Sequence, residues 1–226
     1  MGNTLFLISI QTSIPIYLQY DLVFVLPANV MYDLFNNMEE ELKKALSAHN
    51  KKHINCASRI QSAVLVPLFD KSGECSMLFT QRSNTVAYHK GQISFPGGAH
   101  SEADSGLLDT ALRESWEEIG LKPEDIIVVG ELDDLPTVTS SFIISPFVAI
   151  IPYPYTFVPN PNEIADIFDV PVSALMDKAN FKEEFTISEG EPSSAYSYEY
   201  DGRVIWGATA RIVKQFLDVV RPACNA

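Results

Sequence analysis

An amphipathic helix flanked on both sides by strand-like segments is the feature that most limits the folds open to this chain of 226 residues. Its pattern covers residues 105–119, where apolar residues recur at the spacing of one helix face. Asp104 or Ser105 is predicted to cap this helix, and Gly120 to end it in the left-handed conformation. Because strands are predicted before and after it, the fold class expected is α+β.

The predicted strands and the remaining helices complete this outline. Strand-like runs cover residues 63–69, 76–81, 93–95, 126–129, 142–151, 185–188 and 195–206. Turn residues 70–73 predict a hairpin between the first two runs, and Asp201-Gly202 predicts another within the last. Further helices are predicted at 31–49 and 208–220. A proline-rich loop at 152–161 precedes a predicted helical or turn region at 163–176.

The N-terminal 30 residues differ from the rest of the chain. Residues 1–20 contain no Lys, Arg, Asp or Glu, but no cationic segment precedes the apolar ones, which argues against a signal peptide. We expect residues 1–30 to be an extension: an added strand, a disordered segment, or the product of a start codon placed too early. Residues 31–226 are expected to form a single domain. The three cysteines are widely spaced and indicate neither a disulfide framework nor a zinc motif, so a cytoplasmic location is expected.

The chain is strongly acidic, with 16 Lys and Arg against 29 Asp and Glu and a formal net charge of −13. This balance argues against partners held through a basic surface, namely nucleic acids and anionic membranes. Residues 101–136 hold eleven of the acids and only two basic residues. A solvated face is the ordinary explanation for such a cluster. The positions of three of these acids argue for another explanation.

Three glutamates lie where their charges are unfavourable for the helix alone. Glu114, Glu117 and Glu118 share about one side of the helix, close to its negative C-terminal end. Mutual repulsion and the helix dipole together cost about 1–3 kcal/mol, and only Arg113 is nearby to offset them. A divalent cation that prefers oxygen ligands would remove this cost. The pattern therefore predicts a site for Mg²⁺, or else Mn²⁺, on these carboxylates.

The residues before the helix suggest what such a cation would act on. Residues 95–98 read Phe-Pro-Gly-Gly, which predicts a strand ending in a turn. Gly97 and Gly98 would let the backbone approach a ligand closely. A strand, a glycine turn and a metal-bearing helix together favour a pyrophosphate substrate.

Gly98, Asp104 and residues 113–121 (Arg-Glu-Ser-Trp-Glu-Glu-Ile-Gly-Leu) resemble the Nudix box, G-x5-E-x7-R-E-U-x-E-E-x-G-U with U apolar. The chain departs from the box in three ways. Asp104 replaces a glutamate, one extra residue separates it from Arg113, and Ser115 takes the first apolar position. Residues 78–83, 89–98 and 205–211 also resemble the coenzyme A pyrophosphatase branch of that family. The resemblance covers about residues 60–220.

The resemblance implies a Nudix-type α/β/α sandwich, with a mixed β-sheet between helices, for residues 31–226. It implies Glu114 and Glu118 as the main metal ligands. Glu117 would be a third ligand or the base that orients water. Arg113 would hold the carboxylates in position.

Five further residues are candidates for the same site. Arg82 and His89 are expected to contact the phosphates or the nucleotide, with a surface ion pair and a structural histidine as the alternatives. Gly97 and Gly98 are expected to bind substrate, with a strand terminator as their alternative. Glu163 would supply an additional carboxylate, with an acidic helix start as the alternative.

The reaction implied is metal-dependent hydrolysis of coenzyme A, or a derivative of it, to 3′,5′-ADP and 4′-phosphopantetheine. Two alternatives stay open. The substrate could be another nucleoside diphosphate derivative, such as ADP-ribose, a dinucleotide or a capped nucleotide. The chain could instead be a nucleotide-sensing module without catalysis. The partner expected is a small nucleotide, and the oligomeric state is open between a monomer and a homodimer.

Overall fold

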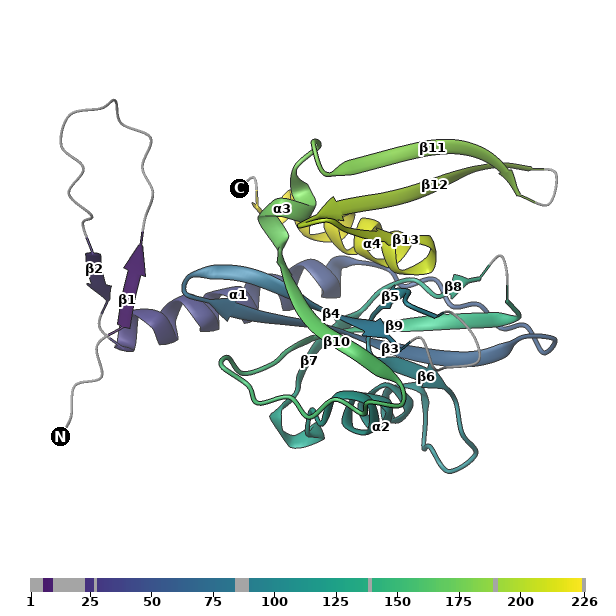
Figure 1. Cartoon of the computed structure of the whole chain (residues 1–226), viewed down its shortest axis with the longest axis horizontal. Coiled ribbons are helices and arrows are strands. Elements are labelled where there is room, and N and C mark those ends of the chain that lie inside the picture. Colours follow the sequence, from purple (N-terminus) through teal and green to yellow (C-terminus); the bar gives the residue numbers. More distant parts are fainter. Residues whose placement is uncertain are drawn as a thin grey trace.

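The computed structural model describes residues 6–9, 23–26, 28–83, 90–137, 140–188 and 191–224, with side chains for 38–83, 90–137, 140–185 and 194–220. A central sheet of eight strands dominates this part of the chain (Figure 1). Its strands are β3 (Ile60–Lys71), β4 (Glu74–Arg82), β5 (Ile93–Ser94), β6 (Gly97–Ala99), β7 (Ile127–Glu131), β8 (Leu135–Pro136), β9 (Phe142–Ile150) and β10 (Ile164–Pro171).

The central sheet is mixed. Its order is β10-β4-β3-β9-β7, with β5 beside β4, β6 beside β3 and β8 beside β9. Strands β3 and β9 are parallel, and the other pairs of this sheet are antiparallel. Parallel neighbours need a crossover connection, and the segment that contains the predicted middle helix supplies it.

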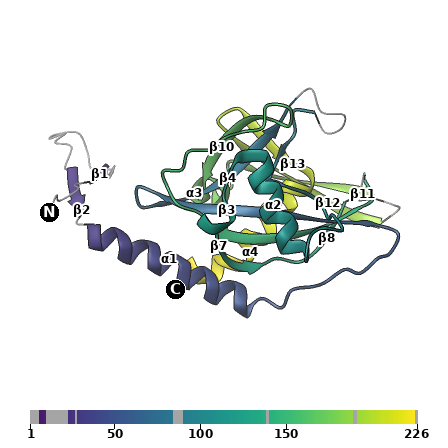
Figure 2. The ribbon, with the colours of Figure 1, turned by 90° about the horizontal axis from the view of Figure 1, so that it is seen from below.

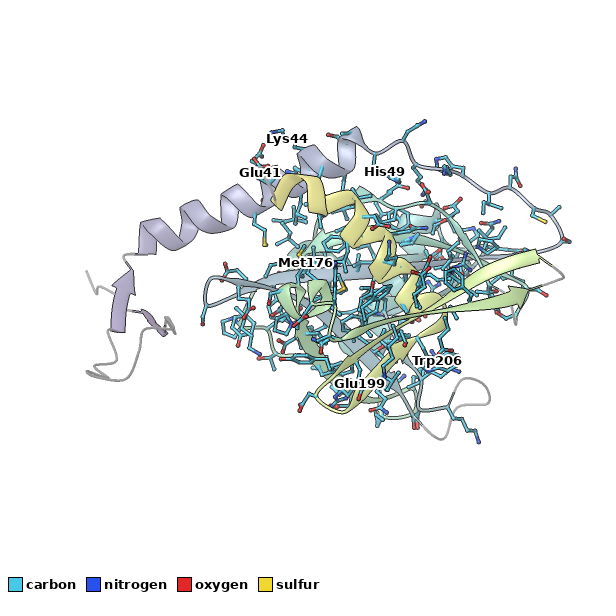
Figure 3. All side chains as sticks on the ribbon, turned by 90° about the horizontal axis from the view of Figure 1, so that it is seen from above. Glu41, Lys44, His49, Met176, Glu199 and Trp206 are labelled. Carbon is cyan, nitrogen blue, oxygen red and sulfur yellow. The ribbon has the colours of Figure 1, made fainter. Side chains whose placement is uncertain are left out.

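Helices cover both faces of this sheet. The helices are α1 (Ala28–Ala48), α2 (Leu107–Ile119), α3 (Val172–Met176) and α4 (Gly207–Cys224), with a 3₁₀ turn, η1 (Pro123–Asp125). Helix α2 lies on one face, and α1 and α4 lie on the other (Figures 1 and 2). Helix α4 begins just after Trp206 and runs toward the part of α1 that carries Glu41 and Lys44 (Figure 3).

Two apolar clusters separate these layers. Successive residues of a strand point to opposite faces, so Leu65 of β3 packs in the cluster under α2 and Val66 packs in the cluster under α1 and α4. Both side chains are fully buried. Ile119 of α2 and Phe216 of α4 fill the same two clusters from the helix sides. The predicted α+β sandwich with a mixed sheet between helices is therefore confirmed.

A second, three-stranded antiparallel sheet packs beside α4. It consists of β11 (Phe181–Ser188), β12 (Glu191–Tyr200) and β13 (Arg203–Trp206). Asp201 and Gly202 form the turn between β12 and β13, both with positive φ, as the Asp-Gly pair predicts. The hairpin at residues 70–73 is also present, because β3 and β4 pair directly across it.

The segment 163–176 is a correction to the sequence-based prediction of a helical or turn region. Residues 164–171 form strand β10, and only Val172–Met176 are helical. Pairing with β4 decides this, because it places Phe168 opposite Phe79 with their rings 5.7 Å apart. Tertiary pairing thus overrides a weak local pattern.

Two local predictions around α2 are also wrong. Gly106, and neither Asp104 nor Ser105, is the N-cap residue, and no side-chain hydrogen bond caps the helix. Residues 97–99 form strand β6 on β3, where a turn was predicted. The predicted stop is confirmed, since Gly120 is left-handed with φ 67°.

The N-terminal strands are β1 (Phe6–Ser9) and β2 (Val23–Leu26), which pair with each other and not with the central sheet. Helix α1 starts at Ala28, three residues before the predicted start. Within the described ranges, no helix combines the length and apolar character needed to cross a membrane.

Candidate functional site

Two carboxylates of α2 face strand β6 of the central sheet. Glu114 and Glu118 are one helical turn apart, so their side chains share one side of the helix. Glu118 is only 2% exposed. Its Oε2 accepts a hydrogen bond of 3.1 Å from the backbone N–H of Gly97 in β6. The helix thus presents its acidic side to strand β6.

Burial disfavours the ionised form of these two carboxylates. It raises the pKa of Glu118 to about 8, although the Gly97 N–H and Arg82 act in the opposite direction. It also raises the pKa of Glu114, against the opposing effect of Arg113. Glu163 raises both pKa values further by its negative charge, so it lies within electrostatic reach of both groups. The nearby arginines therefore do not offset the effect of burial on these two pKa values.

Glycines in β6 make room for the carboxylates. A Cβ at Gly98 would lie 2.4–2.6 Å from the carboxylate atoms of Glu114. A Cβ at Gly97 would lie 2.3 Å from the backbone oxygen of Ala63 in β3. These glycines are predicted from the sequence to admit a ligand. Their close neighbours are the Glu114 side chain and the β3 backbone, and a role in substrate binding stays a prediction.

Arg113 lies at the centre of the hydrogen bonds around this cluster. Its Nη1 donates to Glu114 Oε1 (2.8 Å) and to Glu117 Oε2 (3.1 Å). Its Nε and Nη2 donate to the two oxygens of Asp104, at 2.8 and 3.0 Å, and Nη2 also donates to Ala99 O at 3.3 Å. These contacts use all five N–H groups of the guanidinium.

Asp104 is the partner that the sequence left unassigned. Its side chain is 4% exposed, and hydrogen bonds from Arg113 hold its pKa well below the usual range. Asp104, which stands where the Nudix box has a glutamate, forms an ion pair with Arg113. This shorter acid reaches Arg113 although eight residues separate the two, one more than in the box.

Of the other predicted residues, Arg82 and Glu117 have ion-pair partners within the site. Arg82, at the end of β4, has its Nη1 3.6 Å from Glu118 Oε1, so its partner is a buried site carboxylate and not a surface one. The side chain of Glu117 is 53% exposed and forms an ion pair with Arg113. His89 lies outside the described residues.

Glu163 reaches the cluster from the loop before β10. Its Oε1 accepts a hydrogen bond of 3.0 Å from Asn160 Nδ2. Its backbone oxygen accepts one of 2.7 Å from Ser83 N, and Asn160 N donates to Glu118 O at 2.8 Å. Glu163 precedes a strand, so the alternative of an acidic helix start is wrong.

The donor chemistry of this cluster fits a divalent cation that prefers oxygen ligands. The pKa values of Glu118, which is buried, and Glu114, which is partly buried, stay raised although an arginine lies near each, and a third carboxylate lies within electrostatic reach. In the described residues, however, no three His, Cys, Asp or Glu side chains already converge closely enough to hold a metal ion. Glu114 and Glu117 instead share Arg113. Metal binding by these carboxylates stays a prediction.

A cavity of about 540 Å³ lies elsewhere, between the proline-rich loop and β10. Aromatic rings line it, among them Phe69 and Tyr153, which stack with centroids 5.0 Å apart. None of the site carboxylates lines this cavity. Charge and hydrogen bonding therefore place the candidate site at α2 and β6.

Sequence reasoning missed two residues behind Asp104. Thr110 is fully buried in α2, and its Oγ1 donates to Asp104 Oδ2 at 2.8 Å. His100 Nδ1 lies 3.0 Å from Thr110 Oγ1. A polar residue on the buried side of an amphipathic helix was the signal available for Thr110. His100 carried no comparable signal.

The family model of the NUDIX domain matches residues 59–188, more than half of the chain and all of the site described above. The chain belongs to the Nudix hydrolase family. It is 33% identical over 160 residues to a protein from Photorhabdus laumondii named uncharacterized Nudix hydrolase NudL, and the match covers 71% of this chain and 84% of that protein. NudL of Yersinia pestis is 28% identical over 188 residues, or 83% and 94% of the two chains.

A solved structure supports the fold. A MutT/nudix family protein from Enterococcus faecalis has a TM-score of 0.51 and 13% identity, covering 87% of this chain and 75% of that one. Family membership assigns this Nudix protein to the hydrolases of phosphoric anhydrides, a group that generally uses divalent metal ions.

Proposed function

We propose that this Nudix hydrolase cleaves the pyrophosphate bond of coenzyme A or a coenzyme A derivative, with Mg²⁺ or Mn²⁺, to 3′,5′-ADP and 4′-phosphopantetheine or its acyl form. The observation that carries the chemistry is the pair of carboxylates Glu114 and Glu118, which lie one helical turn apart beside β6 and whose pKa values burial raises. Arg82 Nη1 lies 3.6 Å from Glu118 Oε1, and its guanidinium could pair with the phosphates of a pyrophosphate.

The proposed roles follow from the positions of the side chains. Glu114 and Glu118 bind the cation, which neutralises phosphate oxygens and activates water when it is bound. Glu117, more exposed than the other two, is a third ligand or accepts the proton of the attacking water. Arg113 orients Glu114 and Glu117.

The other residues of the site act on the substrate or on the charge balance. Arg82 and His89 bind the phosphates or the nucleotide, and the backbone at Gly97 and Gly98 forms the adjacent wall. Glu163 adds a carboxylate from the loop before β10, since its charge acts on both Glu114 and Glu118. Protein groups thus mainly position the reacting parts, which is typical of phosphoryl chemistry.

The choice of coenzyme A is supported by how the three stretches that carry the resemblance to that branch come together. Residues 78–82 belong to β4 and residues 93–94 to β5, which pair with each other. Residues 205–206 belong to β13 and 207–211 to α4, and Thr209 Oγ1 donates to Ile93 O at 3.0 Å. Segments more than 100 residues apart therefore adjoin at the end of β4 that carries Arg82.

The test is a substrate panel with the purified full chain. With Mg²⁺ or Mn²⁺, we expect release of 3′,5′-ADP from coenzyme A, identified by mass spectrometry, with kcat/KM about tenfold or more above that for ADP-ribose or a diadenosine polyphosphate. Chelation by EDTA should stop the reaction.

The controls separate the alternatives. Glu114→Gln should lose the activity and rule out a contaminating hydrolase. Cleavage of ADP-ribose or a dinucleotide with coenzyme A untouched would contradict the proposed substrate and leave the metal chemistry intact. Binding of a nucleotide without any cleavage would favour the sensing module.

A further inference from the structure

Thr110 is a fully buried hydroxyl in the first half of α2, and the proposed chemistry does not use it. Three polar groups surround its Oγ1: Asp104 Oδ2 at 2.8 Å, Gly106 O at 3.3 Å and His100 Nδ1 at 3.0 Å. A hydroxyl has one proton to donate. The shorter contact to a charged acceptor takes that proton, because charge-assisted hydrogen bonds are the stronger ones.

This assignment fixes the role of His100. Once the Thr110 proton points to Asp104, the hydroxyl oxygen can only accept from the imidazole, so His100 Nδ1 must carry a hydrogen. His100 lies just after β6, and Thr110 lies one helical turn before Arg113. The hydroxyl therefore links the end of that strand to the helix that carries the carboxylates.

The carboxylate of Asp104 is then held in one orientation by its hydrogen bonds. Its two oxygens accept four hydrogen bonds: two from Arg113, one from Thr110 and one from the backbone N–H of Ser101 at 3.0 Å. Four is about the capacity of a carboxylate. The two bonds to Arg113 are parallel and therefore set the plane of the guanidinium as well as its position.

The plane of the guanidinium decides where the carboxylates lie. Arg113 Nη1 bridges Glu114 and Glu117, while Gly98 limits Glu114 from the opposite side. A tilt of Arg113 would move Glu114 against β6 or release it. Small displacements of this kind are costly at sites that must hold reacting groups in place.

We propose that Thr110 is a positioning residue, whose hydroxyl holds Asp104 in the orientation that keeps Arg113 on the two glutamates. His100 supports that hydroxyl by donating to its oxygen. The role rests on the proposed metal-dependent function of the site. The proposed role also explains how an aspartate can serve at the glutamate position of the Nudix box. The Thr110 hydroxyl supports the Asp104 carboxylate, whose side chain is one methylene shorter than that of glutamate.

The decisive variant is Thr110→Val, which keeps the shape of the side chain and removes the hydroxyl. Outer-layer partners of metal-site residues typically matter by 10- to 100-fold. We expect kcat to fall about tenfold, KM for the nucleotide to change less than threefold, and Mn²⁺ affinity measured by EPR without nucleotide to fall about threefold to tenfold. The Nε–H signal of Arg113 in NMR spectra of the metal-free protein should shift.

Two matched variants separate positioning from stability. Thr110→Ser restores a hydroxyl and should recover kcat and Mn²⁺ affinity to within about threefold of the wild type. Ser115→Ala removes another buried hydroxyl of α2, which donates only to Ala111 O at 2.7 Å, and should leave both quantities within twofold. If Thr110→Val does not fold, His100→Ala replaces it, with His100→Asn as the variant that keeps a donor near the Nδ1 position.

The outcomes are distinct. Unchanged kcat, Mn²⁺ affinity and Arg113 signal in Thr110→Val would overturn the proposal, as would equal losses in Ser115→Ala or failure of Thr110→Ser to recover. If the variant does not fold, an unchanged His100→Ala overturns it. Because Mn²⁺ affinity and the Arg113 signal need no substrate, they test Thr110 even when coenzyme A is not cleaved. Failure of the proposed substrate would then appear only in the substrate panel.

Discussion

Replacing Glu118 by Gln is expected to abolish turnover and, at the same time, to stabilise the metal-free protein. Gln keeps the shape of the side chain and an oxygen that accepts from Gly97 N–H, but it removes the charge that the cation requires. We expect kcat to fall about a thousandfold, since metal ions contribute several kcal/mol to such reactions.

The gain in stability follows from the raised pKa of Glu118. Burial raises that pKa to about 8 from the ordinary value of 4.5, so at neutral pH the metal-free protein must take up a proton at Glu118 when it folds, and above pH 8 it must bury the charge. The contribution of this group to stability is therefore greatest below pH 4.5 and is lost as pH rises toward 8. The Gln variant lacks this loss, and we expect it to be more stable by about 1–3 kcal/mol at pH 8 and by less at pH 5.5.

Urea denaturation in EDTA at both pH values measures this difference. Glu117→Gln is the matched control: its side chain is 53% exposed, so its removal should change the free energy of unfolding by less than about 0.5 kcal/mol. Full activity of Glu118→Gln would contradict its role as a metal ligand. A variant less stable than the wild type at pH 8 would contradict the charge argument.

Adding one methyl group at Gly98 is expected to inactivate the enzyme with little effect on folding. The new Cβ would lie 2.4–2.6 Å from the carboxylate of Glu114, the end of a flexible side chain that can move away. The displaced carboxylate could no longer lie between Gly98 and Arg113. We expect Gly98→Ala to lower kcat about a hundredfold and to change the free energy of unfolding by less than about 1 kcal/mol.

At the neighbouring Gly97, the same substitution is expected to reduce stability. A Cβ at Gly97 would meet the backbone oxygen of Ala63 at 2.3 Å, and Gly97 has φ +152°. Strand backbone cannot move away as a side chain can, so Gly97→Ala should lose about 3 kcal/mol of stability or more. Thermal denaturation and kcat of the two variants should therefore separate. Equal loss of stability in both, or full activity of Gly98→Ala, would contradict this assignment.

Local sequence was enough for the elements whose conformation depends on near neighbours. The stop at Gly120 and the hairpin at Asp201-Gly202 were predicted because positive φ is a local property. The set of glutamates on α2 was predicted because helix periodicity places residues one turn apart on one side. The sequence was therefore enough to identify which residues of α2 are candidates for the site.

Long-range contacts decided the predictions that were wrong or incomplete. Residues 164–171 are a strand because β4 lies beside them, and residues 97–99 are a strand because β3 does. Nothing within these segments specified the partner. The support behind Asp104 was missed for the same reason, since it joins His100 and Thr110 from two different elements.

Glu117 and Glu118 show what the sequence determines and what only the tertiary structure decides. By itself, the sequence determined that two adjacent carboxylates end an amphipathic helix before Gly120, against the helix dipole. Only the tertiary structure decided that the side chain of Glu118 is 3% exposed under β6 while that of Glu117 is 53% exposed. The physical reason is that adjacent helix residues point about 100° apart, and what each one meets depends on strands that pair from elsewhere in the chain.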